Sequence, residues 1–518
     1  MRHLVSLLLA AAVALGCVPA GHAADAGPAK AASTAAHDTH ADKRIPTTET
    51  AVRTRHSARI GGHTLNYTAT AGTVIIRDEK NQPQASVFYV AYTLDGARPG
   101  DRPVTFLYNG GPGSSSVWLH MGSFGPLRIE TDSPHATAPP PYHLVANPDS
   151  LLDKTDLVFI DAVGAGYSRP LGKATGKDFW GVDQDISAFS RAIERYVILN
   201  HRWNSPKFLY GESYGTTRSA ALVDALQDKG MAFNGVILMS SILNYAIRMP
   251  GYDERFVGYL PSFAAAAWYH DRIANKPADL ATFVNQVRTW ARGPYAAALA
   301  QGQDLPDAQL EAIATQMAAY TGLSVDYIRD ANLRVDPGRF RKELLRDQRL
   351  TLGRFDSRFT GTDPDAAGET PDYDASDAGI SGAFVSAFHD YLTNQLDYHS
   401  KLDYRPTYGK IIRGWDWKHR ASGMRRQLPL PYVAGDLAHA MRTNPGLKVL
   451  SVNGYYDFAT PFAITEYDLA HMNLDPSLRG NLSFLYYPSG HMIYLDVDSL
   501  KHLKGDLSRF YDHAAPTR

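Results

Sequence analysis

The stretch KFLYGESYGTTRSAAL, residues 207–222, decides the fold. A short apolar run typical of a buried strand leads into GESYG, and small residues typical of a helix follow at once. The glycines on both sides of Ser213 allow a sharp strand-to-helix turn that would hold the serine hydroxyl above the edge of a sheet. An ordinary turn in which Ser213 caps the helix also fits, so the motif alone leaves both interpretations open.

The composition indicates a large globular protein without a strong electrostatic field. The chain has 518 residues, of which 44% are apolar and 20% charged, and its formal net charge is −1. A chain of this kind buries a sizeable core. Its charge gives no reason to expect nucleic acid or an anionic membrane as a partner. No apolar window is long enough for a transmembrane segment. The sequence does not indicate an oligomeric state.

The N-terminus has the features of a secretory signal. Arg2 and His3 precede an apolar stretch at residues 4–15, and AGHA at 20–23 offers a cleavage site. We therefore expect residues 1–23 to be a signal peptide. Cys17 is the sole cysteine, and lipid attachment there is the alternative. Cleavage near Ala23 leaves a mature protein with no cysteine and hence no disulfide. An exported protein that needs no disulfide suggests a bacterial periplasm or the exterior.

The apolar patterns predict an α/β domain. Residues 24–55 are expected to be a disordered lead. Antiparallel strands are predicted at 63–72, 73–78 and 85–94. Near-continuous apolar runs predict parallel strands covered on both faces, at 104–109, 156–162, 207–212, 235–242, 447–454 and 482–488. Helices between them, such as 183–196, predict a mostly parallel central sheet flanked by helices.

A large helical insertion interrupts this domain. Amphipathic helices are predicted at 262–274, 279–291 and 308–320, and an acidic loop at 362–379. We assign 56–243 and 434–518 to the two parts of the α/β domain and 244–433 to the insertion, which would form a cap. The acidic loop lacks the oxygen ligands of a calcium site, and no cysteine or histidine set suggests a metal, so no metal or cofactor is expected.

Two polar residues follow later strands in the order that a serine nucleophile needs. Asp457 comes shortly after the predicted strand VLSVNG, and His491 comes shortly after the predicted strand FLYYP. In folds with this serine turn, the acid and then the histidine come after the serine, each at the carboxyl end of a strand. The sequence therefore predicts a catalytic triad of Ser213, His491 and Asp457.

A glycine loop supplies the predicted oxyanion site. One backbone donor would be the amide of Tyr214, the residue after the nucleophile. The other is expected in FLYNGGPGSSS, residues 106–116, where the glycines follow a central strand. A plain Gly-Pro turn is the alternative for this loop. Arg218, in the early helix, is expected to form a surface ion pair.

The motifs NGGPGSSS, DAVGAGYS, GESYG, NGYYDFATP and SGHM together resemble those of the serine carboxypeptidases, in the same order along the chain. The resemblance covers roughly residues 61–243 and 445–511 and is weak in the insertion. It implies an α/β-hydrolase fold. It also implies that the Gly111 and Tyr214 amides form the oxyanion hole. Asn109, the Gly110 amide and Glu212 would hold the free carboxylate of a peptide substrate.

The sequence departs from the family pattern at the residue expected to pair with Glu212. The resemblance predicts a second acidic residue at position 123, where this chain has Ser123. A carboxylate binds a glutamate well only when the two share a proton, and a neighbouring acid raises the pKa that makes this possible. Without that acid, the acidic pH optimum implied by the resemblance is expected to be milder.

The favoured function is a serine-type carboxypeptidase that acts on peptides with a free C-terminus through an acyl-enzyme intermediate. An esterase or acyltransferase on the same scaffold is the alternative, since a triad does not dictate the leaving group. A non-catalytic binding protein is the third hypothesis. The preferred side chains and the physiological substrate cannot be predicted from the sequence.

Overall fold

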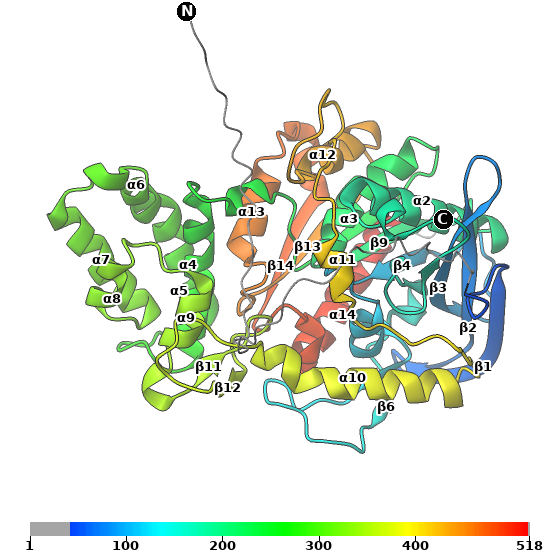
Figure 1. Cartoon of the computed structure of the whole chain (residues 1–518), viewed down its shortest axis with the longest axis horizontal. Coiled ribbons are helices and arrows are strands. Elements are labelled where there is room, and N and C mark those ends of the chain that lie inside the picture. Colours follow the sequence, from blue (N-terminus) through cyan, green and yellow to red (C-terminus); the bar gives the residue numbers. More distant parts are fainter. Residues whose placement is uncertain (1–41, 516–518) are drawn as a thin grey trace, which may run out of the picture. The chain divides into compact units, whose positions relative to one another are not determined.

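A ten-stranded sheet forms the centre of the computed structural model, which describes residues 42–515 (Figure 1). Strands β7-β4-β9-β10-β13-β14 run parallel in that spatial order, and β3, β2 and β1 extend the sheet antiparallel from β7. The strands are β1 (Thr50–Ile60), β2 (His63–Arg77), β3 (Pro83–Leu94), β4 (Val104–Tyr108), β7 (Asp156–Ile160), β8 (Arg169–Pro170), β9 (Lys207–Glu212), β10 (Gly235–Met239), β13 (Lys448–Gly454) and β14 (Leu482–Tyr487).

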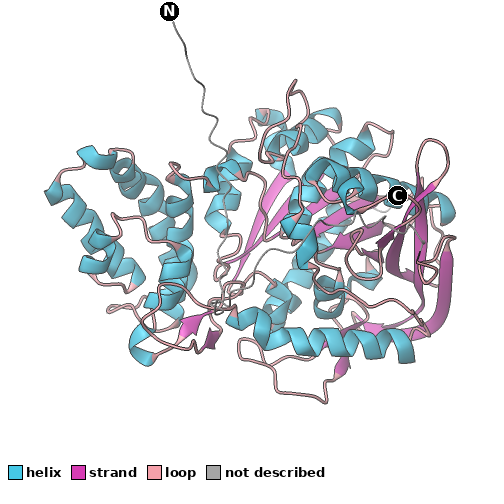
Figure 2. Ribbon diagram, in the orientation of Figure 1, coloured by secondary structure: helices cyan, strands magenta, loops and turns pink. Residues whose placement is uncertain are grey.

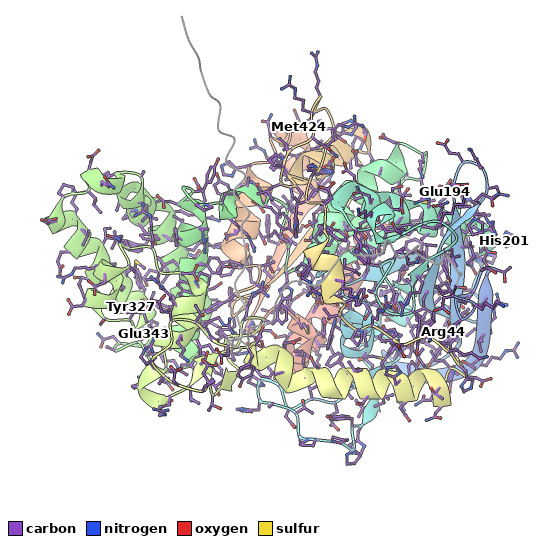
Figure 3. All side chains as sticks on the ribbon, viewed as in Figure 1. Arg44, Glu194, His201, Tyr327, Glu343 and Met424 are labelled. Carbon is purple, nitrogen blue, oxygen red and sulfur yellow. The ribbon has the colours of Figure 1, made fainter. Side chains whose placement is uncertain are left out.

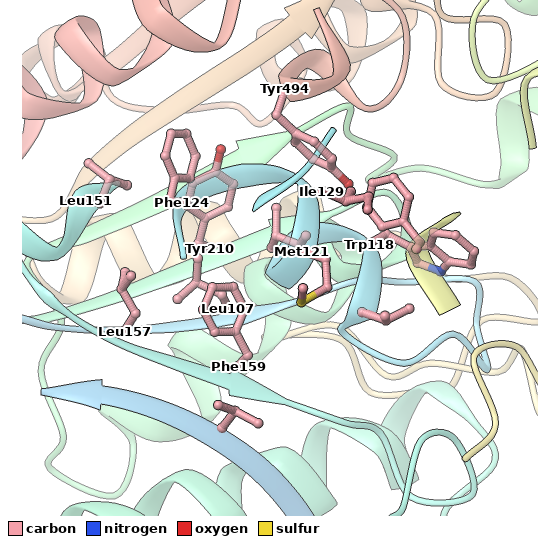
Figure 4. Close-up of a cluster of buried hydrophobic side chains, with 14 of the residues drawn as sticks. Leu107, Trp118, Met121, Phe124, Ile129, Leu151, Leu157, Phe159, Tyr210 and Tyr494 are labelled. Atoms are coloured by element: carbon pink, nitrogen blue, oxygen red, sulfur yellow. The ribbon is translucent and has the colours of Figure 1, made fainter. Parts of the chain in front are cut away.

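The central strands are mostly apolar because both faces of the sheet are covered. Every residue of β4, β7, β9 and β10 is buried. Successive side chains enter opposite cores, so Phe208 and Tyr210 belong to one core and Leu209 to the other. Figure 4 shows part of the core that contains Tyr210, where Tyr210 and Leu107 lie near Phe124. The predicted sheet, parallel in its centre and antiparallel at its start, is confirmed.

Helices cover the two faces of the sheet, as Figure 2 shows. One face carries α2 (Val182–Leu199), α3 (Tyr214–Gln227) and α12 (Ala434–Thr443). The other carries α1 (Val117–Leu119), the short helix His120–Phe124, α10 (Ala375–Asn394) and α14 (Val497–Ala514). Side chains fill the space between these layers, whereas the labelled Arg44, His201 and Met424 are exposed (Figure 3). None of the helices in residues 42–515 is long and apolar enough to cross a membrane.

The beginning of the chain differs in part from the prediction. The disordered lead expected through residue 55 is wrong for its last six residues, because Thr50–Ile60 pairs along its whole length with β2. The two strands predicted at 63–72 and 73–78 are one continuous strand. The predicted signal peptide and Cys17 lie outside the described residues.

Only the first part of the predicted insertion has a core of its own. Side chains from the helices between residues 246 and 345 form a third apolar cluster, which includes Phe458 and Ile464 of the α/β part. These helices are α4 (Glu254–Tyr269), α5 (Leu280–Trp290), α6 (Ala296–Leu299), α7 (Asp307–Thr321), α8 (Val325–Asp330) and α9 (Pro337–Glu343). The later part packs on the sheet. Residues 375–379, predicted as loop, are the first turn of α10, which Asp374 caps.

A buried histidine fastens the end of the insertion to the α/β part. His419 follows the short helix α11 (Gly409–Arg413) and is 3% exposed. Its Nδ1 lies 2.6 Å from Asp183 of α2, and its Nε2 lies 2.9 Å from Asp436 of α12. Burial by itself would lower the pKa of His419, but the hydrogen bonds to the two carboxylates outweigh it and raise that pKa to about 9.

We expect His419 to make stability fall in mild alkali. Because the folded pKa lies above the unfolded one, the contribution is fully present below about pH 6.5 and is lost as the pH rises through about 9. Because Asp183 is partly exposed, solvent screens its interaction with His419 and limits the loss of unfolding free energy to about 2 kcal/mol. Urea unfolding of the wild type should show this loss between these pH values, and His419→Gln should not. The exposed His399→Gln is the matched control. Equal losses in all three proteins would contradict the assignment.

Candidate active site

Ser213 lies at a strained turn between β9 and α3. Its backbone has φ 61° and ψ −131°, a conformation that is unusual for a residue other than glycine. Its amide donates to the Met239 carbonyl at the end of β10 over 3.1 Å. Its side chain makes no capping hydrogen bond with α3. The interpretation of Ser213 as a helix cap is therefore not supported, and its hydroxyl is left partly exposed.

The glycines of the motif allow backbone segments to approach one another. A Cβ atom at Gly211 would lie 2.1 Å from the Gly215 carbonyl oxygen, and one at Gly215 would lie 2.8 Å from that of Tyr108. A Cβ atom at Gly110 would lie 2.4 Å from the Tyr214 amide nitrogen. Any side chain at these positions would push the serine turn away from β4 and from the glycine loop.

Asp457 and His491 form a buried, hydrogen-bonded pair at the ends of β13 and β14. Asp457 Oδ2 lies 2.7 Å from His491 Nδ1, and the two residues are 0% and 1% exposed. Burial by itself lowers the pKa of His491, but the Asp457 carboxylate raises it above the ordinary value. Burial raises the pKa of Asp457, and the imidazole reverses this and holds it below the usual range. This contact favours the tautomer with the proton on Nδ1, which leaves Nε2 able to accept a proton.

Three further residues hold this pair, Thr460, Ala459 and Ser240, and sequence reasoning missed all of them. The Thr460 hydroxyl lies 2.7 Å from Asp457 Oδ2 and 3.1 Å from His491 Nδ1. The amides of Ala459 and Thr460 donate to Asp457 Oδ1 over 2.7 and 3.0 Å. Ser240, directly after β10, donates from its hydroxyl to the His491 carbonyl over 2.6 Å. The Asp-x-x-Thr spacing of DFAT is the sequence signal for the local turn at Asp457.

The serine is linked to the acid–base pair indirectly. No hydrogen bond joins the Ser213 hydroxyl to His491 within residues 42–515. Both residues bond instead to the end of β10, Ser213 to Met239 and His491 to Ser240. Hydrogen bonds between catalytic groups often form fully only in the complex with substrate.

The predicted oxyanion donors lie on the glycine loop and at the start of α3. Gly111 has φ 103°, a value that favours glycine. Its amide and that of Tyr214 are not among the amides hydrogen-bonded within the described part of the chain. Two such amides near a partly exposed serine are suited to bind an oxyanion.

Asn109 and Glu212, predicted to hold a carboxylate, contact each other. Asn109 Nδ2 donates to Glu212 Oε1 over 2.8 Å, and Asn109 Oδ1 accepts from the Leu119 amide over 2.9 Å. Arg218 Nη1 donates to the Asn109 carbonyl over 2.8 Å, and its Nε donates to Asp185 over 2.7 Å. Arg218 is fully buried, so the predicted surface ion pair is wrong. A buried ion pair instead fixes the loop that carries Asn109.

Glu212 is an unusual carboxyl group because it is buried without a full set of partners. It is 1% exposed, and its Oε2 has no hydrogen bond among the described residues. Burial raises the pKa of Glu212 to about 7, although His491, Tyr494 and Asn109 partly offset the effect. The Tyr494 hydroxyl likewise has no partner within residues 42–515. Ser123 contacts the Leu119 carbonyl instead.

The described residues contain no group of three or more histidine, cysteine, aspartate or glutamate side chains placed to hold a metal ion. A cavity of about 820 Å³ lies between the cap helix α4, β14 and α13 (Phe462–Ala470). Its lining includes Pro261, Arg292 and Glu466, and none of the predicted site residues. The acid–base pair and the serine turn therefore lie elsewhere.

Comparison with known proteins gives one family. The family model described as serine carboxypeptidase matches residues 62–346, which is more than half of the chain. The match includes the glycine loop and the serine turn, whereas Asp457 and His491 lie beyond it.

Two curated relatives show the extent of the similarity. The pheromone-processing carboxypeptidase KEX1 of Saccharomyces cerevisiae (strain ATCC 204508 / S288c) is 31% identical over 145 residues, which cover 26% of this chain and 19% of the yeast protein. Serine carboxypeptidase-like 45 of Arabidopsis thaliana is 26% identical over 217 residues, which cover 39% of this chain and 43% of the plant protein. The matched regions thus span less than half of either relative.

A solved structure extends the likeness to most of the chain. The crystal structure of KEX1(delta)P, a prohormone-processing carboxypeptidase from Saccharomyces cerevisiae, matches with a TM-score of 0.50 and 16% identity. It covers 86% of this chain and 91% of that chain. At this identity the likeness is one of fold, and it agrees with the α/β-hydrolase fold predicted from the sequence.

Proposed function

The chain belongs to the serine carboxypeptidase family, and from this membership we propose that it is a serine-type carboxypeptidase that releases the C-terminal amino acid of a peptide. The observation that carries the proposal is Glu212, the residue before the serine. Its carboxyl group is buried beside Asn109, has one oxygen without a partner and has a pKa raised by burial to about 7. An enzyme that recognised only an ester would not require this group.

The proposed reaction begins with attack on the last peptide bond. The Ser213 oxygen bonds to the carbonyl carbon while His491 Nε2 takes the hydroxyl proton. The Gly111 and Tyr214 amides donate to the oxyanion that forms. When the C–N bond breaks, His491 returns the proton to the departing amine. Water then attacks the acyl-enzyme by the same route and frees the shortened peptide.

Asp457 stabilises the imidazolium that exists between these proton transfers. Its carboxylate lies 2.7 Å from His491 Nδ1 and is itself held by two backbone amides. It is therefore preorganised to receive the positive charge without reorientation.

The free carboxylate of the substrate is proposed to bind Asn109, the Gly110 amide and Glu212. A protonated Glu212 donates a short O–H···O⁻ hydrogen bond to that carboxylate, and this bond is stronger than one between neutral groups. Because the pKa of Glu212 is raised to about 7, the proton is present in mildly acidic solution and is lost as the pH rises through about 7.

From the N-terminal pattern we infer that the protein is exported, with cleavage near Ala23. N-terminal sequencing of the mature protein tests this inference. A lipid at Cys17 would contradict the cleavage site but not the export.

A substrate series tests the proposed activity. We expect an N-blocked dipeptide with a free carboxylate to be hydrolysed with a kcat/KM at least about 100-fold above that of its C-terminal amide, because the amide cannot share the Glu212 proton. Initial rates at about pH 6, where Glu212 holds its proton, give the comparison. The matching ester serves as a control for triad activity. Equal rates on acid and amide would contradict the carboxylate site, and a fast ester with inert peptides would favour an esterase.

A further inference from the structure

A short segment from the middle of the predicted insertion is bonded to the loops that carry both Asp457 and His491. We call residues 353–359 the histidine strap. The Phe355 carbonyl accepts from the His491 amide over 2.6 Å. The Arg354 carbonyl accepts from the Phe458 amide over 3.1 Å, and the Ser357 amide donates to the Tyr456 carbonyl over 3.0 Å. The strap therefore fixes the positions of the two loops relative to each other.

Buried charges fix the histidine strap in place. Arg358 and Asp356 form an ion pair of 2.7 Å with side chains that are 6% and 4% exposed. Arg358 also bonds to Asp496 and to the Pro488 carbonyl, both over 3.0 Å. A Cβ atom at Gly490 would lie 2.5 Å from the Phe355 carbonyl oxygen, so only glycine allows this approach. A satisfied buried network of this kind makes a segment rigid.

The ring of Phe355 lies on one face of the proposed catalytic imidazole. The centroids of Phe355 and His491 are 5.1 Å apart, and the ring planes differ by 24°, a stacked arrangement. No other aromatic ring stacks on His491 within residues 42–515. Asp457 and Thr460 contact only the Nδ1 edge of the imidazole. Edge contacts fix one atom, whereas a contact with the face fixes the plane of the ring.

We propose that Phe355 is a positioning residue for His491, holding the plane of the imidazole toward Ser213 and keeping water from one of its faces. The inference rests on the proposed function, because it takes His491 as the base. Phe355 belongs to the predicted insertion and, like His491, lies beyond the region matched by the family model, residues 62–346.

The contact also has an electrostatic consequence. The face of an aromatic ring attracts a cation, and His491 becomes a cation each time it takes a proton. The charged groups that face His491 are Asp457, Glu212 and Arg354. The two carboxyl groups favour the imidazolium and Arg354 opposes it. Removing the ring while keeping an apolar side chain is therefore expected to make the imidazole less basic.

The test follows covalent labelling of Ser213 by a fluorophosphonate, which needs a working base but no substrate carboxylate. Labelling rates are measured across pH for the wild type, Phe355→Leu, Phe355→Tyr and Phe359→Leu. Phe359 lies in the same strap and is buried, so its variant controls for loosening of the strap. Thermal unfolding of each variant is recorded in parallel.

We expect Phe355→Leu to slow labelling about tenfold and to move the midpoint of its pH dependence down by about half a unit. Phe355→Tyr should restore both quantities, and Phe359→Leu should leave the midpoint unchanged. A Phe355→Leu protein that labels like the wild type at every pH would overturn the inference. So would an equal shift in Phe359→Leu.

The outcome is separable from that of the proposed function. If the wild type labels at Ser213 but shows no preference for a free carboxylate, the carboxypeptidase proposal fails and the role of Phe355 is still measured. If the wild type does not label at Ser213, both proposals fail.

Discussion

Ser213→Ala should lower kcat/KM for a peptide with a free carboxylate by on the order of 10⁵-fold. Without the hydroxyl there is no acyl-enzyme, and the remaining hydrolysis depends on the Gly111 and Tyr214 amides and on substrate binding alone. The loss corresponds to about 7 kcal/mol of transition-state stabilisation. KM should change little, because the proposed carboxylate site is untouched. Steady-state rates at saturating and limiting substrate separate the two parameters.

The matched control is Ser187→Ala, on the exposed side of α2. It should retain wild-type kinetics. Both variants should unfold at the wild-type temperature, since the Ser213 side chain makes no capping bond and alanine leaves the strained backbone as it was. More than about a hundredth of wild-type activity in Ser213→Ala would contradict its role as the nucleophile. Mass spectrometry of the fluorophosphonate adduct would then show which residue acts instead.

The fold was predictable where burial alone shapes the sequence. Strands β4, β7, β9 and β10 are buried on both faces, so each appears as a mostly apolar run without a regular alternation of polar residues. Helix α10 was not predicted, although Phe384, Phe388 and Tyr391 follow a helical spacing. Gly379 and Gly382 lower helix propensity, and residues 375–379 continue the acidic stretch that the sequence predicts as a loop. Packing on the sheet stabilises it regardless.

Only those residues of the candidate site that belong to sequence motifs could be predicted. The order serine, acid, histidine at strand ends indicated Asp457 and His491, and the structure brings these two into contact. Thr460 follows from a local turn, but Phe355 does not, because its contact with His491 joins segments far apart in the chain. No local pattern encodes a tertiary contact of this kind.

The pKa of Glu212 shows a second limit of sequence reasoning. The loss of an acidic partner at Ser123 suggested a weaker rise in this pKa. In the structure burial supplies the rise, to about 7, and the Tyr494 hydroxyl is close enough to offset part of it. Gly122 makes room for the ring of Tyr494, since a Cβ atom there would lie 2.4 Å from it. Desolvation depends on three-dimensional packing, and a motif does not report it.

Glu212 is expected to set the alkaline limit of activity on free-carboxylate substrates. Its pKa is raised to about 7, so it is protonated below this pH and donates to the substrate carboxylate. Above it, two negative charges would face each other. KM should then rise about tenfold for each pH unit. The corresponding ester has no carboxylate, so its KM should stay flat. The acid limit, set by protonation of His491, should be common to both substrates.

Glu212→Gln removes the titrating group but keeps a side chain that can donate a hydrogen bond. We expect its KM for the free-carboxylate dipeptide to be independent of pH between about 6 and 9, and to fall below that of the wild type at the alkaline end. Asp468→Asn is the matched control. Asp468 is also a buried carboxyl group with a pKa raised by burial to about 7, but its Oδ2 accepts from the Leu243 and Asn244 amides.

If the alkaline rise in KM persists in Asp468→Asn and disappears in Glu212→Gln, the proton that holds the substrate belongs to Glu212. A rise that persists in Glu212→Gln would mean that another group recognises the carboxylate. In that case Glu212 would serve only to hold the serine turn. A carboxyl group with a raised pKa can help to bind a negatively charged substrate only by donating its proton in a hydrogen bond.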